Sequence, residues 1–318
     1  MKLALLLLIG ASAATACAGK TVLRVGYFPN VTHAQGVIGS QTTREGHGWF
    51  EARLGPGVEV QWYPFNAGPS AMEAIFAGSI DLTYVGPNPA LNAYIRSQGG
   101  EIRVLAGAAE GGAALVVAGD GRIKAPADFR GKRVATPQFG NTQDVAARAW
   151  LRAQGFKVTQ TGGDVLVVPT ANPDQLAALT SNRADAVWTV EPWVSRLERE
   201  AGGRVFLEQG DAVTTLLVSS VRFLREHPDL AAQFRAAHVE LTQWINAHPA
   251  EAENLVRAGL RATVGRDVSA ELVASAWRRL RFTSQLEPSQ IAGLVADAQG
   301  AGFLRDAIPL DRLFSGKP

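Results

Sequence analysis

Apolar and polar positions along the chain alternate between two periods, one typical of strands and one typical of helices. The run from Thr21 to Tyr27 is rich in β-branched and apolar residues, which predicts a strand. Between Ser70 and Ala77, the residues Met72, Ile75 and Phe76 recur at helical spacing, which predicts a helix with one buried face. Strands and helices continue to alternate in this way beyond this point, so the predicted class is α/β.

The same reading extends over the rest of the chain. Further strands are predicted over 58–63, 80–85, 115–118, 133–136, 165–169, 184–189 and 213–219. Helices are predicted over 90–97, 125–132 (short, with a turn), 143–153, 173–180, 192–201, 228–248, 250–261, 269–279 and 288–300. Asn88 and Pro89 are predicted as the N-cap and first residue of the helix that starts at Ala90. After residue 219 the pattern is helical to the end.

The order of these elements predicts two lobes. The stretches 78–87 and 182–192 share one plan, in which a helix end and an Asp precede an apolar strand and a Pro that opens the next helix. A chain that leaves one lobe, builds another and returns needs two crossovers, which we expect near 112–116 and 212–217. The expected first lobe is therefore 21–112 with 217–318, and the expected second lobe is 113–216.

The first residues have the pattern of a secretory signal peptide, expected over 1–16. Lys2 precedes the apolar run from Leu3 to Ile9, which is far shorter than the roughly 20 residues of a transmembrane helix. Ala14 to Ala16 fits a cleavage site and would leave Cys17 as the new N-terminus, which resembles a bacterial lipoprotein box. Lipidation of Cys17 and plain secretion both remain open, and both place the protein in the periplasm or outside the cytoplasm.

Composition narrows the function further. The chain has 318 residues with 47% hydrophobic and 19% charged residues, which is typical of a globular protein. A formal net charge of +2 without a basic cluster gives no support to nucleic-acid binding. The single cysteine excludes internal disulfides, and the five histidines show no metal-ligand spacing, so neither a metal nor a cofactor is expected. A monomer is the expected state.

Three loops that follow predicted strands could hold a ligand. In open α/β sheets, ligands lie beyond the carboxyl ends of the strands, where the free N–H groups of helix starts favour anions. Each loop contains a glycine, which allows close approach to the backbone, and a short polar side chain. Ordinary helix capping explains such loops equally well. The three loops are 67–70, 86–88 and 138–142.

Eight segments of the chain have a recognisable order and spacing. They are 26–34, 65–69, 78–81, 86–90, 128–135, 140–142, 184–188 and 191–193. Together they resemble the solute-binding proteins of bacterial ABC importers in the nitrate, sulfonate and taurine group. The resemblance covers nearly the whole chain after residue 16.

The resemblance implies a two-lobed periplasmic-binding-protein fold of type II, each lobe a mixed sheet flanked by helices. It implies that the lobes close on one small anionic or zwitterionic solute, which is sulfonate-, taurine- or nitrate-like, and deliver it to an ABC permease in the inner membrane. Catalysis is not expected. The expected ligand-binding residues are Asn30, Thr32, His33, Gly68, Ser70, Gly86, Asn88, Gln138, Gly140, Asn141, Thr142, Trp188 and Glu191.

Some of these residues have a second interpretation. His33 could bind an anionic group, or its imidazole could order its own loop. Glu191 would suit a ligand with a positive charge, but it also lies at the first turn of a predicted helix, where acidic residues are favoured. Trp188, Trp193 and Tyr84 could line a cleft or belong to the core of a lobe.

Two other functions remain open. The first is an enzyme on the same fold, related to the group that makes the thiamine pyrimidine. Against it, the chain has no cysteine after Cys17, no Gly-x-Ser-x-Gly and no His-Glu-x-x-His. The second is a sensor that presents its ligand to a membrane receptor, which the sequence does not separate from import.

Overall fold

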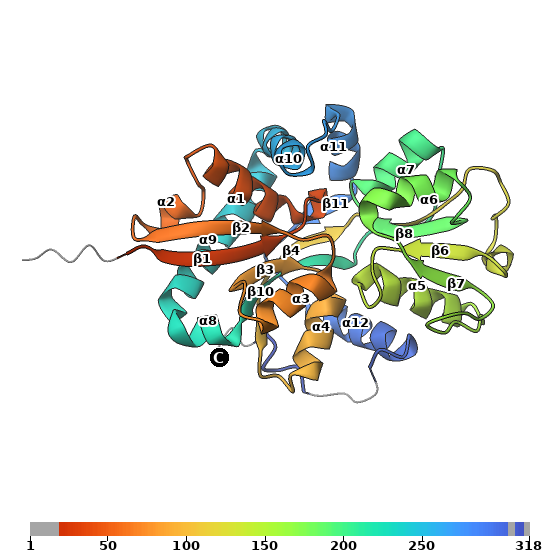
Figure 1. Cartoon of the computed structure of the whole chain (residues 1–318), viewed down its shortest axis with the longest axis horizontal. Helices are drawn as coiled ribbons and strands as arrows, with labels where there is room; N and C mark the ends of the chain where they lie inside the picture. The colour runs from red at the N-terminus through yellow and green to blue at the C-terminus, as the bar shows by residue number, and fades with distance from the viewer. Residues whose placement is uncertain (1–18, 305–308, 315–318) are drawn as a thin grey trace, which may run out of the picture.

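The computed structural model describes residues 19–304 and 309–314 and contains two mixed β-sheets flanked by helices (Figure 1). The expected signal peptide and Cys17 lie outside the described residues. Within the described part of the chain, no helix is both long and apolar enough to cross a membrane. The predicted α/β class is confirmed.

The first sheet has six strands in the order β11-β4-β10-β3-β1-β2. β1 pairs in parallel with β2 and β3, whereas β10 pairs antiparallel with β3 and β4. Its strands are β1 (Thr21–Tyr27), β2 (Val58–Pro64), β3 (Leu82–Val85), β4 (Ile102–Gly111), β10 (Val213–Ser220) and β11 (Leu280–Phe282).

The second sheet has five strands in the order β7-β6-β8-β5-β9. β6 is parallel to β7 and β8, and β5 is antiparallel to β8 and β9. Its strands are β5 (Ala113–Val117), β6 (Arg133–Thr136), β7 (Leu166–Pro169), β8 (Ala186–Val190) and β9 (Arg204–Gln209).

Helices cover both sheets, as Figure 1 shows. By the predicted limits of the lobes, those of the first lobe are α1 (Ala34–Arg44), α2 (Glu51–Leu54), α3 (Gly68–Phe76), α4 (Pro87–Arg96), α8 (Val221–Glu226), α9 (Pro228–Ala247), α10 (Pro249–Val264), α11 (Ala270–Trp277) and α12 (Pro288–Gly300). Those of the second lobe are α5 (Thr142–Ala153), α6 (Gln175–Thr180) and α7 (Trp193–Ala201). The short 3₁₀ turns are η1 (Val31–His33), η2 (Pro126–Phe129) and η3 (Asn172–Asp174).

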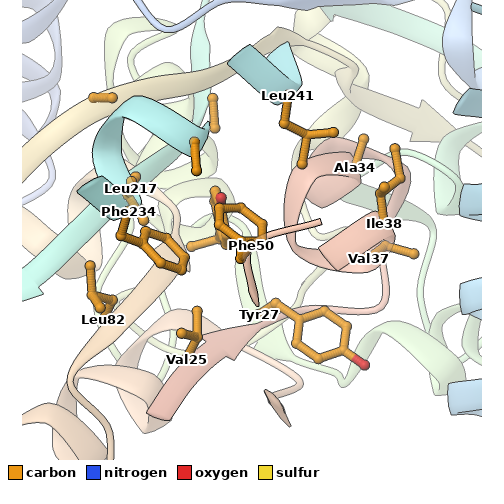
Figure 2. Close-up of a cluster of buried hydrophobic side chains, with 14 of the residues drawn as sticks. Val25, Tyr27, Ala34, Val37, Ile38, Phe50, Leu82, Leu217, Phe234 and Leu241 are labelled. Carbon is orange, nitrogen blue, oxygen red and sulfur yellow. The ribbon is translucent and has the colours of Figure 1, made fainter. Parts of the chain in front are cut away.

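The core of the first lobe lies on both faces of its sheet. On one face, Val25 and Leu217 from the strands pack with Phe234 of α9 and with Phe50, whose rings stack with centroids 4.3 Å apart (Figure 2). Val218, the next residue along β10, belongs to the cluster on the opposite face. This alternation is the period of two that a strand buried on both sides requires.

The chain passes between the sheets twice, at Gly112 and over 210–212. Gly111 and Gly112 have φ of 74° and 69°, a region that favours glycine. A Cβ at Gly112 would lie 2.5 Å from Leu280, so this passage is closely packed. The limits of the lobes stay a prediction. The pairing of β10 with β4 begins at Val213, so the second passage ends before that residue.

Two local predictions are wrong. The C-terminal third is not helical throughout, because β11 pairs with β4 and forms one edge of the first sheet. Asn88 is not an N-cap: the helix starts earlier, at Pro87, with Gly86 as its cap. Proline fits either position in a first turn, where its missing N–H needs no partner, so the pair Pro87 and Pro89 left the start ambiguous.

Candidate functional site

The starts of α4 and α5 meet between the two lobes. The backbone N–H of Asn88 donates to Oγ1 of Thr142 at 3.4 Å, which is a long hydrogen bond. A Cβ added to Gly86 would lie 2.4 Å from the same Oγ1, so only glycine allows this approach. Two of the three predicted loops, one from each lobe, are therefore in direct contact.

The third predicted loop belongs to the first lobe and lies against the start of α4. Gly68 is the first residue of α3, and a Cβ there would lie 2.2 Å from the ring of Pro89 in α4. Ser70 follows in the first turn of α3 and is half-buried. The structure thus brings the starts of α3, α4 and α5 together.

A buried carboxylate shapes the loop of the second lobe. Asp144 is fully buried and accepts hydrogen bonds from the N–H of Gly140 at 3.0 Å and from Oγ1 of Thr136 at 2.9 Å. Arg148, one turn later on α5, pairs with it at 3.1 Å. Gly140 has φ of 74°, which this tight loop requires. These bonds fix the loop from within the second lobe, so its other side faces the first lobe.

Helix capping occurs in this loop beside polar atoms that have no partner among the described residues. The side chain of Asn141 caps α5 by accepting from the N–H of Gln143 at 3.0 Å. Gln138 is half-buried, and its Oε1 has no hydrogen-bond partner among the described residues. Nδ2 of Asn88 is likewise buried and without a partner in the part of the chain that the structure describes. Unpaired buried polar atoms are costly, so each needs an explanation.

The loop after β1 also reaches the second lobe. Nε1 of Trp193, at the start of α7, donates to Oδ1 of Asn30 at 2.9 Å, and both side chains are buried. A recess of about 290 Å³ lies beside this bond. We call it the amide recess, because three asparagines line it and no charged side chain does. Its lining includes Asn30, Phe65 and Asn66 of the first lobe and Asn172 and Trp193 of the second.

His33 and Thr32 are buried in η1, directly after this loop. Nδ1 of His33 accepts from the N–H of Phe28 at 3.4 Å, and the two rings stack with centroids 4.3 Å apart. Burial lowers the pKa of His33 to about 3, so its imidazole is neutral at physiological pH. These contacts are those of a side chain that orders its own loop.

Trp188 and Glu191 are not brought together with the other predicted residues. Trp188 is buried in the hydrophobic cluster of the second lobe, and its Nε1 donates to Gln209 at 3.1 Å. Glu191 is fully buried and accepts from the N–H and Oγ of Ser195 at 3.1 and 2.9 Å. Arg279 of the first lobe pairs with Glu191 at 3.1 Å. Burial raises the pKa of Glu191, and these partners oppose that rise.

The predicted ligand-binding residues did not include Asn66, Asn172 and Trp193, which line the amide recess. Asn172 follows β7, so the rule that ligands lie beyond the carboxyl ends of strands could have identified it. Asn66 follows β2 in the same way. No signal in the sequence identifies Trp193 as the partner of Asn30, because 163 positions separate them. Among the described residues, no group of three or more His, Cys, Asp or Glu is placed to hold a metal ion.

Comparisons with known proteins identify related sequences. The sequence model of the NMT1-like family matches residues 16–259. The taurine-binding periplasmic protein of Escherichia coli is 29% identical over 61% of this chain, and a putative aliphatic sulfonates-binding protein of the same organism is 30% identical over 66%. The matched part spans only 59% and 63% of the length of these relatives.

Solved structures show the same fold. The alkanesulfonate-binding protein SsuA of Xanthomonas axonopodis pv. citri, bound to MOPS, superposes with a TM-score of 0.71 at 21% identity, over 89% of this chain and 93% of its own. The periplasmic nitrate-binding protein NrtA of Synechocystis PCC 6803 superposes with a TM-score of 0.72 at 16% identity, over 90% and 82%. The predicted two-sheet fold of periplasmic binding proteins is confirmed.

Proposed function

This chain belongs to the NMT1-like family, and from that premise we propose that it is the extracytoplasmic solute-binding component of an ABC importer. In this proposal it captures one small anionic or zwitterionic solute between its lobes and passes it to a membrane permease, without chemical change. The names of the relatives state that they bind taurine, aliphatic sulfonates and nitrate or nitrite, and this supports a solute of the same kind.

The meeting of α4 and α5 carries the proposal. Both helix starts carry partial positive charge, and they come from different lobes. The first turn of α5 offers backbone N–H groups, whereas in α4 Pro87 and Pro89 have none and the N–H of Asn88 already donates to Thr142. Nδ2 of Asn88 adds a donor that no described residue satisfies. A solute with oxygen acceptors would satisfy these donors and hold both lobes at once, which favours the closed conformation.

The proposed contacts follow from this arrangement. We assign ligand contact to Asn30, Ser70, Asn88, Gln138, Asn141 and Thr142, with Gly68, Gly86 and Gly140 providing backbone approach. Residues outside the described part of the chain, including Cys17, are proposed to direct the protein out of the cytoplasm and to anchor it by a lipid.

A thermal-shift screen tests the function. Purified chain is mixed with sulfonates, nitrate, carboxylates, amino acids and aromatic acids, and each positive result is followed by isothermal titration calorimetry. We expect at least one class to raise the melting temperature and to bind one molecule per chain. The absence of a shift with every class would overturn the proposal.

Two variants tie binding to the assigned place. Thr142→Val removes Oγ1 at nearly constant volume and is expected to weaken binding about tenfold. Thr180→Val changes an exposed threonine on α6 and serves as the matched control. Equal affinities of the two variants would place the ligand elsewhere.

A further inference from the structure

The chain just beyond α12 reaches the second lobe. Residues 138–142, which we call the α5 loop because they lead into α5, carry several of the proposed ligand contacts. Phe303 lies against this loop, since its ring and that of Phe139 have centroids 5.0 Å apart. A Cβ added to Gly140 would lie 3.5 Å from the ring of Phe303. Phe303 therefore contacts consecutive residues of the α5 loop.

Arg152 of α5 ties the same segment to the second lobe. Its Nη1 donates to the carbonyl of Gly300 at 2.7 Å, and a Cβ added to Gly302 would lie 3.3 Å from that nitrogen. The guanidinium is also held within the second lobe, because Nε and Nη2 donate to the carbonyl of Val158 at 3.2 and 2.7 Å. The bond to Gly300 therefore comes from a group whose position is already fixed.

Apolar burial joins α12 to both lobes. Val145 of α5 is fully buried in the hydrophobic cluster that contains Leu91 of α4. Ala298, near the end of α12, and Leu304 belong to the same cluster. Figure 1 shows α12 beside α4 and α5, and α12 contacts both helices. Burial of these side chains favours the conformation in which the lobes touch.

A recess of about 270 Å³ lies at the same place. Phe303 and Leu304 line it together with Phe139 and Gly140 of the α5 loop, and the rest of its lining comes from α3 and α4. Phe303 thus lies where the α5 loop faces the two helices of the first lobe whose starts belong to the proposed site. It also lies beyond residue 259, where the match to the family model ends.

We propose that Phe303 is a positioning residue for solute binding. Through Phe139 it holds the α5 loop toward the starts of α3 and α4, and together with the bond from Arg152 it ties the two lobes to each other at the end of α12. The proposal rests on the proposed function, because the α5 loop carries proposed ligand contacts. Phe303 itself acts through the loop and is not assigned a contact with the solute.

The affinity for a solute from the screen, measured by calorimetry, tests the positioning role. Phe303→Ala is expected to weaken binding about two- to tenfold, which corresponds to the loss of one aromatic pair. Phe303→Tyr keeps the ring and is expected to keep the affinity of the unaltered chain. Unchanged affinity in Phe303→Ala, or the same loss in Phe303→Tyr, would overturn the inference.

A double-mutant cycle tests whether Phe303 acts through the α5 loop. Phe139 is 38% exposed, so Phe139→Ala is expected to leave the fold intact and to weaken binding as Phe303→Ala does. The double variant is expected to lose less than the product of the two single factors, because each ring acts through the other. Losses that multiply in full would mean that the two rings act independently, which would contradict the proposal.

Phe314→Ala is the matched control. Phe314 is half-buried like Phe303 and packs against the same hydrophobic cluster, but among the described residues no ring contact joins it to the second lobe. Its loss is expected to lower the melting temperature without changing affinity. A loss of affinity equal to that of Phe303→Ala would show that both residues act only through the stability of the C-terminal segment, and the inference would fail.

Small-angle scattering without solute separates this inference from the proposed function. Phe303→Ala is expected to have a larger radius of gyration than the unaltered chain, and Phe314→Ala the same radius, because only the first substitution releases a contact between the lobes. Identical curves for all three proteins would overturn the inference even if solutes bind, and the importer function would stand. If no solute binds the unaltered chain, the proposed function fails, and the scattering alone decides whether Phe303 holds the lobes together.

Discussion

The indole nitrogen of Trp193 and the side-chain oxygen of Asn30 lie 2.9 Å apart, and they belong to different lobes. Neither side chain has appreciable access to water, since Asn30 is 3% and Trp193 is 7% exposed. A buried hydrogen bond of this kind requires the lobes to be close together, so it contributes directly to the equilibrium between open and closed conformations.

Trp193→Phe is expected to weaken solute binding about three- to tenfold, because the closed conformation loses one hydrogen bond and leaves Oδ1 of Asn30 unpaired. Calorimetry with a ligand from the screen measures this loss. Trp49→Phe is the matched control: its Nε1 donates to the carbonyl of Ala237 within the first lobe. It is expected to lower stability without changing affinity. A larger loss of affinity in Trp49→Phe than in Trp193→Phe would contradict a role for Asn30 and Trp193 in closure.

Gly86→Ala is expected to reduce affinity at least tenfold, because its Cβ would lie 2.4 Å from Oγ1 of Thr142 and would push α4 and α5 apart. A second substitution, Thr142→Gly, is expected to relieve the collision and restore part of the closure, which small-angle scattering can follow in both variants.

Gly57→Ala is the control for this substitution, because nothing lies within 4 Å of the Cβ that it adds. It is expected to leave affinity and the scattering curve unchanged. Normal binding by Gly86→Ala would show that the contact between α4 and α5 is not part of the binding conformation.

Arg279→Met is expected to cost about 3–5 kcal/mol of folding free energy, because it leaves the fully buried carboxylate of Glu191 without its cation. Arg279 also pairs with Glu198 and Glu208 of the second lobe at 2.9 and 3.3 Å. Urea denaturation measures the loss. The double variant Glu191→Gln with Arg279→Met is expected to recover much of it.

An exposed ion pair gives the comparison for Arg279. Arg196→Met breaks a partly exposed pair with Glu200 one turn along α7 and is expected to cost less than about 1 kcal/mol. A similar small cost for Arg279→Met would mean that the buried pair with Glu191 contributes little to holding the lobes.

His238 is expected to destabilise the protein in acid. It is buried, its Nδ1 lies 3.0 Å from the hydroxyl of Tyr84, and its Nε2 lies 2.8 Å from the carbonyl of Gly107. Burial lowers its pKa from 6.5 to about 4. Between these two values the unfolded chain binds a proton that the folded protein does not, so stability falls as the pH falls, by up to about 3 kcal/mol.

His238→Gln keeps a side-chain amide that can donate to Gly107 and removes the titrating group. Urea denaturation at pH 7 and pH 4.5 is expected to show a smaller loss of stability for this variant than for the unaltered chain. The carboxylates titrate in both proteins, so their contribution cancels in the difference. Equal losses would contradict the assignment to His238.

Much of the fold could be predicted because it is encoded locally. β1 and β6 have the predicted limits, since each is a short β-rich run between breakers. β4 was missed because half of its ten residues are Ala or Gly, which have low strand propensity; its position between β10 and β11 determines its conformation instead. β11 was missed because three residues within a helical pattern carry no period of their own.

The part of the candidate site that lies in loops directly after strands could be predicted from the sequence. The loops around Gly68, Gly86 and Gly140 were identified because a glycine and a short polar residue follow a strand in each, and the structure brings them together. The cationic partner of Glu191 could not be identified in this way, because Arg279 lies 88 positions further along the chain.

The position of β10 in the first sheet has a consequence for how the protein is made. β3 and β4 pair with opposite edges of β10, so the two halves of that sheet cannot join until Val213–Ser220 has left the ribosome or the export channel. The second sheet needs nothing beyond Gln209. A nascent chain is therefore expected to complete the inserted lobe first, while the strands synthesised earliest wait with open edges that chaperones must shield.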